Sequence, residues 1–187
     1  MQEEVDFVLD SCKESMVAAI RHLEKELVHI RAGKASPAML DSVQVEYYGS
    51  MTPLTQVSNV STPDARTIAI QPWEKGLIPV IEKAIMAANL GLNPENNGEI
   101  IRINIPVLTE ERRKNLVKQV HGEGENAKVS IRTARRDAKD ELKKLLKEGL
   151  SEDAEKDAEG EVQKLTDEFG KKVDTLVEAK EEDIMTI

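Results

Sequence analysis

Aromatic residues and cysteines are scarce in this chain of 187 residues. Aromatics make up 3% of it, which is too few for a compact β-rich core and fits long helices better. The single cysteine, Cys12, excludes an internal disulfide and a cysteine-based zinc site. No apolar run approaches the roughly 18 residues of a membrane-spanning helix, and no basic segment typical of a secretory signal opens the chain. We therefore expect a soluble, cytoplasmic protein with no membrane partner.

Basic residues are also in the minority, because 26 Lys and Arg stand against 35 Asp and Glu, for a net charge of −9. Such an acidic chain is not a general nucleic-acid coat. Its charge is nevertheless segregated. Residues 109–147 hold twelve Lys and Arg against seven Asp and Glu, whereas residues 148–187 hold five against fourteen. If the chain binds RNA, it does so through a local patch, and the acidic remainder limits non-specific binding.

Residues 109–147 are predicted to form one long helix, because they contain no proline and their apolar residues recur at steps of three, four or seven. Thr109 followed by Glu110 and Glu111 is typical of a helix start. At about 1.5 Å per residue the helix is about 58 Å long, so it must be the spine of a bundle. Its apolar face consists of Leu116, Val120, Ala127, Ile131, Ala134, Ala138 and Leu145.

A basic stripe follows the same helix, about a quarter turn or more away from the apolar face. A charge run on a bundle helix is ordinarily a solvated face, and that interpretation stays open. The segregation of charge along the chain instead favours an electrostatic binding surface. The stripe consists of Lys128, Arg132, Arg135, Arg136, Lys139 and Lys143.

Two further amphipathic helices are predicted, over residues 3–30 and from the N-cap residue Ser151 onwards. None of the three helices is stable alone, so we expect them to bury their apolar stripes together in a three-helix bundle. The two stripes are Val5, Leu9, Cys12, Met16, Ala19, Leu23, Leu27 and Ile30 in the first helix, and Ala158, Val162, Leu165, Phe169, Val173 and Leu176 in the last.

Residues 31–105 have a different composition and are predicted to form a small α+β block. Alternating apolar residues and turn signals indicate strands at 43–48, 51–55, 57–61, 66–71 and 99–105, with a helix at 77–89. The predicted organisation is therefore a discontinuous bundle, 1–30 and 106–187, with 31–105 inserted into it. The two crossings between these parts are a candidate hinge, formed by Gly33, Lys34, Ser36, Ile105 and Pro106.

Other motifs are weak signals. Gly122 and Gly124 lie within the long helix and follow no strand, so they indicate a soft spot rather than a phosphate loop. Cys12 is expected to be a core thiol, and His22 and His29 to be surface residues. No catalytic set can be assembled from Ser, His, Asp or Cys, which argues against an enzyme. Without further information, a structural or chaperone-like helical protein and a hydrolase with its site in the inserted block remain alternatives.

Several motifs in order along the whole chain resemble the bacterial ribosome recycling factor family. They include residues 30–37 (IRAGKASP), 45–49 (VEYYG), 90–94 (LGLNP), 108–114 (LTEERRK) and 131–137 (IRTARRD). Lys34 departs from the arginine that is usual in the first motif, and Gly124 stands where we expect alanine. The resemblance implies a three-helix bundle with a β/α/β domain inserted through a flexible hinge, in an L shape.

The resemblance also implies a function in protein biosynthesis, after translation termination. The protein would be no enzyme and would need no cofactor or metal. It would act as a monomer on the post-termination ribosome, binding large-subunit ribosomal RNA. With GTP-bound elongation factor G it would split the ribosome into subunits and release messenger and tRNA. The implied RNA contacts are Arg31, Lys128, Arg132, Arg135, Arg136 and Lys139, with Arg112 and Arg113 as secondary or interdomain contacts.

Overall fold

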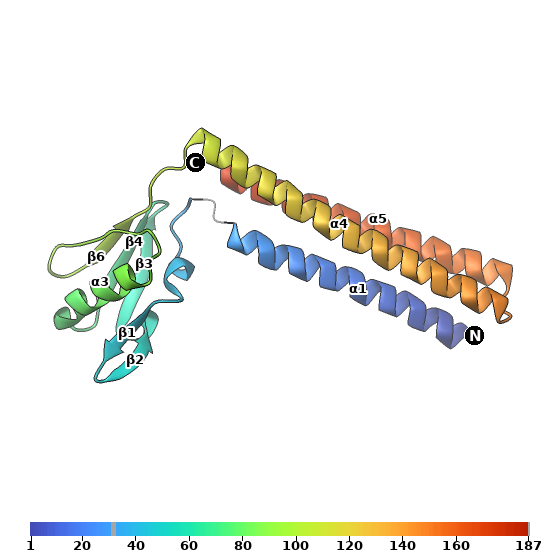
Figure 1. Cartoon of the computed structure of the whole chain (residues 1–187), viewed down its shortest axis with the longest axis horizontal. Coiled ribbons are helices and arrows are strands. Elements are labelled where there is room, and N and C mark those ends of the chain that lie inside the picture. Colours follow the sequence, from blue (N-terminus) through green and yellow to red (C-terminus); the bar gives the residue numbers. More distant parts are fainter. Residues whose placement is uncertain (31–32, 187) are drawn as a thin grey trace. The chain divides into compact units, whose positions relative to one another are not determined.

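The chain folds into two compact units. A computed structural model describes residues 1–30 and 33–186. The bundle unit comprises Met1–Ala32 and Glu110–Ile187, and the sheet unit comprises Gly33–Thr109 (Figure 1). The sequence alone placed the boundaries after residues 30 and 105. The mixed α+β class, with long helices in a bundle and a small β-sheet domain, is confirmed.

The bundle unit is built from α1 (Gln2–His29), α4 (Glu110–Lys147) and α5 (Glu152–Met185). Helix α4 runs antiparallel to both of its neighbours and contacts each along its length (Figure 1). Its first buried residues are Leu116 and Val120, and the stripe continues through Ala127, Ile131, Ala134 and Ala138 as predicted. Burial of these faces against one another is what stabilises helices of this length.

The ends of the predicted stripes needed correction. Leu142 is fully buried on α4, whereas the predicted Leu145 is only half-buried. On α5, Val177 and Ile184 are buried, whereas Leu165 and Leu176 are half-buried. On α1, Ile20 joins the core and Leu9 lies at its margin. The 3.6-residue period identifies a face correctly, but each neighbouring helix decides which edge of that face it covers.

The turn between α4 and α5 fixes the register of these two helices. Gly149 has a φ of 113°, and the amide of Leu150 donates to the carbonyl of Leu145 at 2.9 Å. The Gly149 amide donates to Leu146, which completes a Schellman motif. Ser151 then caps α5, since its side chain accepts a hydrogen bond from the Ala154 amide at 3.2 Å.

Cys12 lies in the core of the bundle unit, as expected. Its thiol is buried and donates to the carbonyl of Ala134 on α4 at 3.7 Å. Burial raises the pKa of the Cys12 thiol, so the reactive thiolate is disfavoured.

The sheet unit contains, among its described residues, an antiparallel sheet of four strands in the order β3-β4-β6-β5 and a separate hairpin, β1–β2. A core of isoleucines, among them Ile68, Ile70, Ile101 and Ile103, joins the sheet to helix α3. The strands are β1 (Gln44–Tyr47), β2 (Ser50–Pro53), β3 (Ser58–Asp64), β4 (Thr67–Pro72), β5 (Pro94–Asn96) and β6 (Ile101–Asn104). The helices are α2 (Leu54–Val57) and α3 (Ile78–Ala87), with 3-10 turns at Pro37–Leu40 and Lys75–Leu77.

Two elements of the sheet unit were not predicted. Strand β5 forms where the sequence indicated only a helix end and a turn, because pairing with β6 stabilises an otherwise polar segment. The short helix α2 separates two segments that were both predicted as strands. It forms because Leu54 and Val57, three residues apart, both reach the core.

The two glycines of α4 have different surroundings, which the sequence does not reveal. Gly122 is exposed, and a methyl group added to it would meet nothing within 4 Å. Gly124 is buried, and a Cβ there would lie 2.6 Å from a methyl carbon of Val177 on α5. Gly124 is therefore a point of close helix approach rather than a soft spot.

Alanine substitutions at these two glycines should have opposite effects. Gly122→Ala should raise the free energy of unfolding by about 0.5–1 kcal/mol, because helix propensity improves in open space. Gly124→Ala should lower it by about 1–3 kcal/mol, because overpacking against Val177 outweighs the same gain. Urea unfolding monitored by circular dichroism measures both. Val177→Ala should relieve the Gly124→Ala defect, and a stabilising Gly124→Ala would contradict the packing described.

Candidate nucleic-acid interface

The six cations of the basic stripe on α4 form two rows. At about 100° per residue, and taking Lys128 as zero, Arg135 and Lys139 lie at about −20° and +20°. Arg132, Lys143 and Arg136 lie further round, at about +40°, +60° and +80°. We call Lys128, Arg135 and Lys139 the inner row, because they border α5. We call Arg132, Arg136 and Lys143 the outer row.

The inner row is paired with polar side chains of α5. Lys128 Nζ lies 2.8 Å from Asp174 Oδ1, and Lys139 Nζ lies 3.8 Å from Glu159 Oε2. The hydrogen bond that Lys128 donates to Asp174 is the main cause that raises the pKa of Lys128. Both lysine side chains are about one-third exposed, at 32% and 34%. These cations help to join the two helices, so they are not fully available to a ligand.

Arg135 and His121 extend this contact along the helix. Arg135 Nη1 donates to Gln163 Oε1 at 3.5 Å, and Gln163 in turn donates to Asp167 at 2.9 Å. Arg135 Nε is buried and has no hydrogen-bond partner among the described residues. His121 Nε2 lies 3.1 Å from Glu181. His121 and Lys128 are seven residues apart, as are their partners Glu181 and Asp174, whereas Arg135 contacts Gln163 and is linked to Asp167 only through it.

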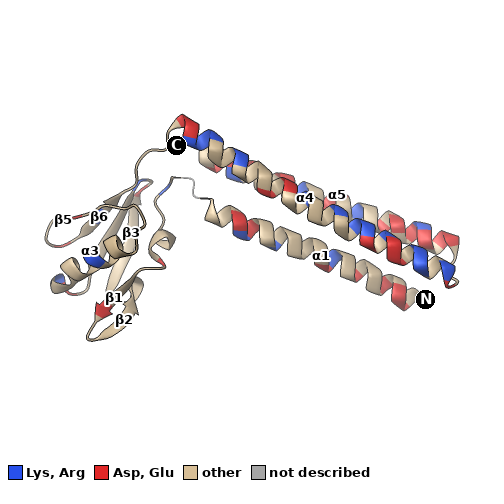
Figure 2. Cartoon of the chain, in the orientation of Figure 1, with Lys and Arg blue, Asp and Glu red and all other residues tan. Residues whose placement is uncertain are grey.

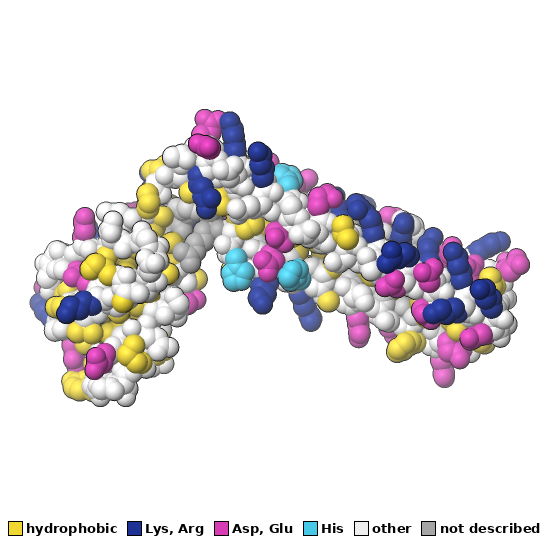
Figure 3. Space-filling view, in the orientation of Figure 1, with side chains coloured by type: hydrophobic (Ala, Val, Ile, Leu, Met, Phe, Trp, Pro, Cys, Tyr) yellow, Lys and Arg dark blue, Asp and Glu magenta, His cyan; other side chains and the backbone are white. Residues whose placement is uncertain are grey.

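The outer row faces solvent. Arg132 and Lys143 are exposed, and neither has a hydrogen bond or an ion pair within residues 1–30 and 33–186. Arg136 Nε lies 3.7 Å from its chain neighbour Asp137, and its side chain is 70% exposed. A contact of that length between exposed groups contributes little. Figure 2 shows Lys and Arg at intervals along α4, and Figure 3 shows basic side chains exposed on the bundle unit. The outer row therefore presents guanidinium and ammonium groups that an anionic ligand can reach.

The remaining predicted cations lie near the start of α4 or outside the described residues. Arg31 lies outside the residues that the structure describes. Arg112 is exposed, and Arg113 is half-buried with its Nε lacking a hydrogen-bond partner in the described part of the chain. Lys114 pairs with Glu110 at 3.0 Å, one helical turn earlier. Residues 110–114 thus contain one ion pair within the helix, together with two arginines in the first turn of α4.

The candidate hinge residues Gly33, Lys34, Ser36, Ile105 and Pro106 all belong to the sheet unit. Two of its backbone hydrogen bonds hold the adjoining segments on the turn between β3 and β4. The Ala35 amide donates to the Ala65 carbonyl at 2.8 Å, and the Ile105 amide donates to the Arg66 carbonyl at 2.7 Å. The Ser36 hydroxyl accepts from the Ala38 amide, which opens a 3-10 turn.

Gly33, on the first connecting segment, lies directly against Leu108 on the second connecting segment. Its φ is +73°, and a Cβ added to it would lie 2.6 Å from Leu108 Cγ. Glycine is required there both by the backbone conformation and by the close approach of Leu108.

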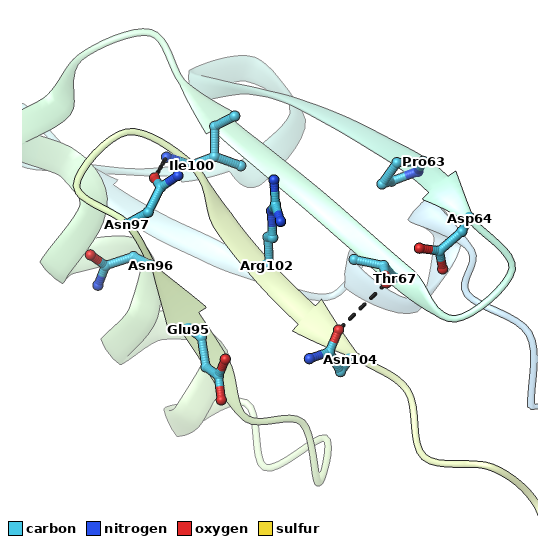
Figure 4. A pocket seen from close by; sticks show the side chains of 9 residues that line it. All are labelled: Pro63, Asp64, Thr67, Glu95, Asn96, Asn97, Ile100, Arg102 and Asn104. Atoms are coloured by element: carbon cyan, nitrogen blue, oxygen red, sulfur yellow. Dashed lines mark hydrogen bonds between the residues drawn. The ribbon is translucent and has the colours of Figure 1, made fainter.

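One face of the sheet forms a concave surface. A cavity of 400 Å³ is lined by residues from β3, β4, β5, β6 and the loop between β5 and β6, among them Asp64, Arg102 and Asn104 (Figure 4). Thr67 donates to Asn104 across the two strands at 3.4 Å. Backbone hydrogen bonding, chiefly from Arg66, lowers the pKa of Asp64. The lining holds amides, carboxylates and one guanidinium, without histidine or cysteine.

The part of the chain that the structure describes contains no cluster of side chains that could bind a metal ion. No three His, Cys, Asp or Glu side chains lie close enough there to hold a metal ion. No described helix is long and apolar enough to cross a membrane.

Comparisons with known proteins agree on one family. The sequence model of the ribosome recycling factor family matches residues 23–185. The ribosome-recycling factor of Flavobacterium psychrophilum is 61% identical over 187 residues, covering 100% of both chains. That of Flavobacterium johnsoniae is 59% identical with the same coverage.

Two solved structures resemble this one. The solution structure of a ribosome recycling factor has a TM-score of 0.76 at 40% identity and covers 98% of each chain. The other is reported as models for the T. thermophilus ribosome recycling factor and the E. coli elongation factor G bound to the E. coli post-termination complex. It has a TM-score of 0.61 at 47% identity and covers 97% of this chain and 98% of that one.

Charge removal should affect stability in the inner row but not in the outer row. Lys128→Gln should lower the free energy of unfolding by about 0.2–1 kcal/mol, because the pair with Asp174 is lost. Arg132→Gln should change it by less than about 0.5 kcal/mol. A double-mutant cycle with Asp174→Asn, measured by urea unfolding at low and high salt, isolates the pair. A coupling of zero at low salt would remove the structural role given to the inner row.

Gly33→Ala should destabilise the sheet unit more than Gly91→Ala does. Both glycines have positive φ, but a Cβ at Gly91 meets nothing within 4 Å. We expect Gly91→Ala to cost about 1–2 kcal/mol from backbone strain, and Gly33→Ala to cost at least about 1 kcal/mol more from the clash with Leu108. Thermal unfolding of both variants provides the comparison. Equal losses would show that Leu108 moves aside freely.

Proposed function

Because the chain belongs to the ribosome recycling factor family, we propose that it recycles ribosomes after translation termination. It binds the post-termination ribosome through large-subunit ribosomal RNA. Together with elongation factor G and GTP, it separates the subunits and so releases messenger and tRNA. The related structure with elongation factor G and a post-termination complex supports this assignment of partners. The chain acts in the cytoplasm, as a monomer and without a cofactor.

The observation that carries the RNA-binding part is the accessibility of the outer row. Arg132 and Arg136 are one turn apart and point their guanidinium groups to solvent, and Lys143 continues the row two turns later. A planar guanidinium pairs with two phosphate oxygens at once, which suits a helix that lies along structured RNA. The row spans about 16 Å of α4, enough to reach several phosphates. Recognition is therefore of RNA shape rather than of sequence.

The inner row supports this surface instead of making its main contacts. Lys128 and Lys139 are engaged by acids of α5, and Arg135 is half-buried beside Gln163. Burial of the apolar stripe of α4 sets its rotation, and with that rotation the inner row borders α5 while the outer row is turned outwards. We retain Arg31 as an RNA contact, on the strength of the resemblance and its positive charge. Arg112 and Arg113 remain proposed as interdomain or secondary contacts.

The hinge residues are proposed to let the sheet unit move as a lever. The hydrogen bonds of Ala35 and Ile105 join both connecting segments to the same turn. We therefore expect Ser36 and Ile105 to move with the sheet unit, and the chain to bend about Gly33, Lys34 and Pro106, when the ribosome is split. The free energy for splitting comes from GTP hydrolysis on elongation factor G, and this chain contributes binding and leverage.

Removing the outer row should weaken ribosome binding without unfolding the bundle. We expect Arg132→Ala to cost about 1–3 kcal/mol in binding, by analogy with charge-assisted hydrogen bonds, and Arg135→Ala to cost less. Log affinity should fall linearly with log salt, and each lost phosphate contact should reduce the slope by about one. Sedimentation with purified ribosomes measures affinity, and light scattering with elongation factor G and GTP measures splitting.

Arg21→Ala is the matched control, since Arg21 is an exposed arginine on α1. It should leave both affinity and salt slope near those of the unaltered chain. Equal affinity of the Arg132→Ala, Arg136→Ala double variant and the unaltered chain would remove this site. A flat salt dependence would indicate contacts to protein alone.

A further inference from the structure

Most of the few aromatic side chains of this protein gather at one place on the sheet unit. The chain has two Phe, two Tyr and one Trp. Tyr47, Tyr48 and Trp73 lie at the β1–β2 hairpin or beside Glu74, whose carboxylate both tyrosines contact. Tyr48 is 83% exposed and Trp73 is 68% exposed. Large exposed rings are uncommon on a protein that has so few, and they favour a binding role.

The backbone at Tyr48 is held in an unfavourable conformation. Tyr48 has a φ of 46° and Gly49 a φ of 80°, the two positive values that a type I′ turn requires between Tyr47 and Ser50. Asn or Asp ordinarily precedes Gly in such a turn, and a bulky residue is strained there. The turn therefore holds an aromatic ring in solvent at a position where a small polar residue would be more stable. Strain of this kind is common at binding sites.

Glu74 organises the cluster. The hydroxyl groups of Tyr47 and Tyr48 both donate to Glu74 Oε1, at 3.3 and 3.5 Å. The two rings meet edge to face, with centroids 4.5 Å apart. Partial burial, together with the charge of Glu74, raises the pKa of Tyr47, so its hydroxyl stays protonated as a donor. The rings and the carboxylate thus form one preorganised group.

The carboxylate of Glu74 has no cation beside it. Its chain neighbour Lys75 is engaged with Glu99, at 2.9 Å, and no ion pair to Glu74 occurs within the described residues 33–109. A carboxylate that lies next to exposed aromatic side chains attracts a guanidinium or an ammonium group, by an ion pair with Glu74 and a cation–π contact with Tyr48 or Trp73. The same surface repels phosphate, so RNA does not suit it.

We propose that Tyr48, Trp73 and Glu74 form a docking point for an arginine or lysine side chain on a basic segment of a protein. This inference rests on the proposed function, because a basic protein of the post-termination complex is then the partner. It assigns opposite chemistry to the two units. The outer row of the bundle unit binds RNA, and the aromatic cluster of the sheet unit binds protein.

Trp73 is the single tryptophan of the chain and lies in the proposed site, so its fluorescence reports on docking directly. Full-length protein is titrated with a peptide of alternating arginine and glycine. We expect a saturable shift of Trp73 emission to shorter wavelength. Glu74→Gln, which keeps the acceptor oxygen but loses the charge, should weaken binding at least about fivefold, and Tyr48→Ala should do the same. Glu95→Gln, another exposed carboxylate of the sheet unit, is the matched control.

Several outcomes would overturn the inference. They are an unchanged emission, an equal affinity of the Glu74→Gln variant, an equal loss in Glu95→Gln, or the same shift produced by oligouridylate. Circular dichroism shows whether each variant is folded. Should Tyr48→Ala fail to fold, Glu74→Gln alone decides, because it preserves the hydrogen bonds of both tyrosines.

A second experiment places the site in the assembly. A photoreactive amino acid replaces Tyr48, and the protein is irradiated on purified ribosomes with elongation factor G. A crosslink to a Lys- or Arg-rich protein segment supports the proposal, whereas a crosslink to RNA, or none, overturns it. Ribosome binding by the same protein is measured in parallel. If the unaltered protein does not bind ribosomes, the proposed function is contradicted instead. The peptide titration tests the docking point separately, because it needs no ribosome.

Discussion

The antiparallel packing of α4 against α5 determines which charges of this protein remain available to a partner. Both helices are highly charged, and their charges have opposite sign. Where they meet, Lys128 and Lys139 are matched with Asp174 and Glu159, and Gly124 lets the helices approach closely at Val177. Burial of the apolar stripe of α4 sets its rotation about its axis, and these contacts agree with that rotation. The side chains one step further round, Arg132 and Arg136, are left in solvent as a consequence.

Much of the fold follows from local signals in the sequence. The three long helices were predicted from apolar periodicity, and the cap at Ser151 from its residue type. Errors occurred where tertiary contacts decide. Leu142 is buried in preference to Leu145 because of how the neighbouring helices cover α4, and β5 exists because β6 lies beside it. The residues of α4 and of β5 alone do not contain this information.

The candidate site was predictable as a stripe but not as two rows. Sequence spacing places all six cations on one side of α4, yet their separation depends on the position of α5. The seven-residue spacing of His121 and Lys128, matched by that of Asp174 and Glu181, was a sequence signal for this pairing that the prediction did not use. The roles of Gly124 and Gly33 could not be foreseen, because each depends on one residue distant in the chain, Val177 and Leu108. The RNA contacts themselves, Arg31 among them, remain predictions.

Two contacts between α4 and α5, His121–Glu181 and Lys128–Asp174, are seven residues apart on both helices, and this spacing has a consequence for how the bundle unit can change in length. A single residue inserted in either helix would rotate every later pair out of line by about 100°. Removing or adding seven residues in each helix of the bundle would preserve the pairing and change the length by about 10.5 Å. The length of the bundle unit can therefore change only in steps of seven residues if these pairs are to be kept.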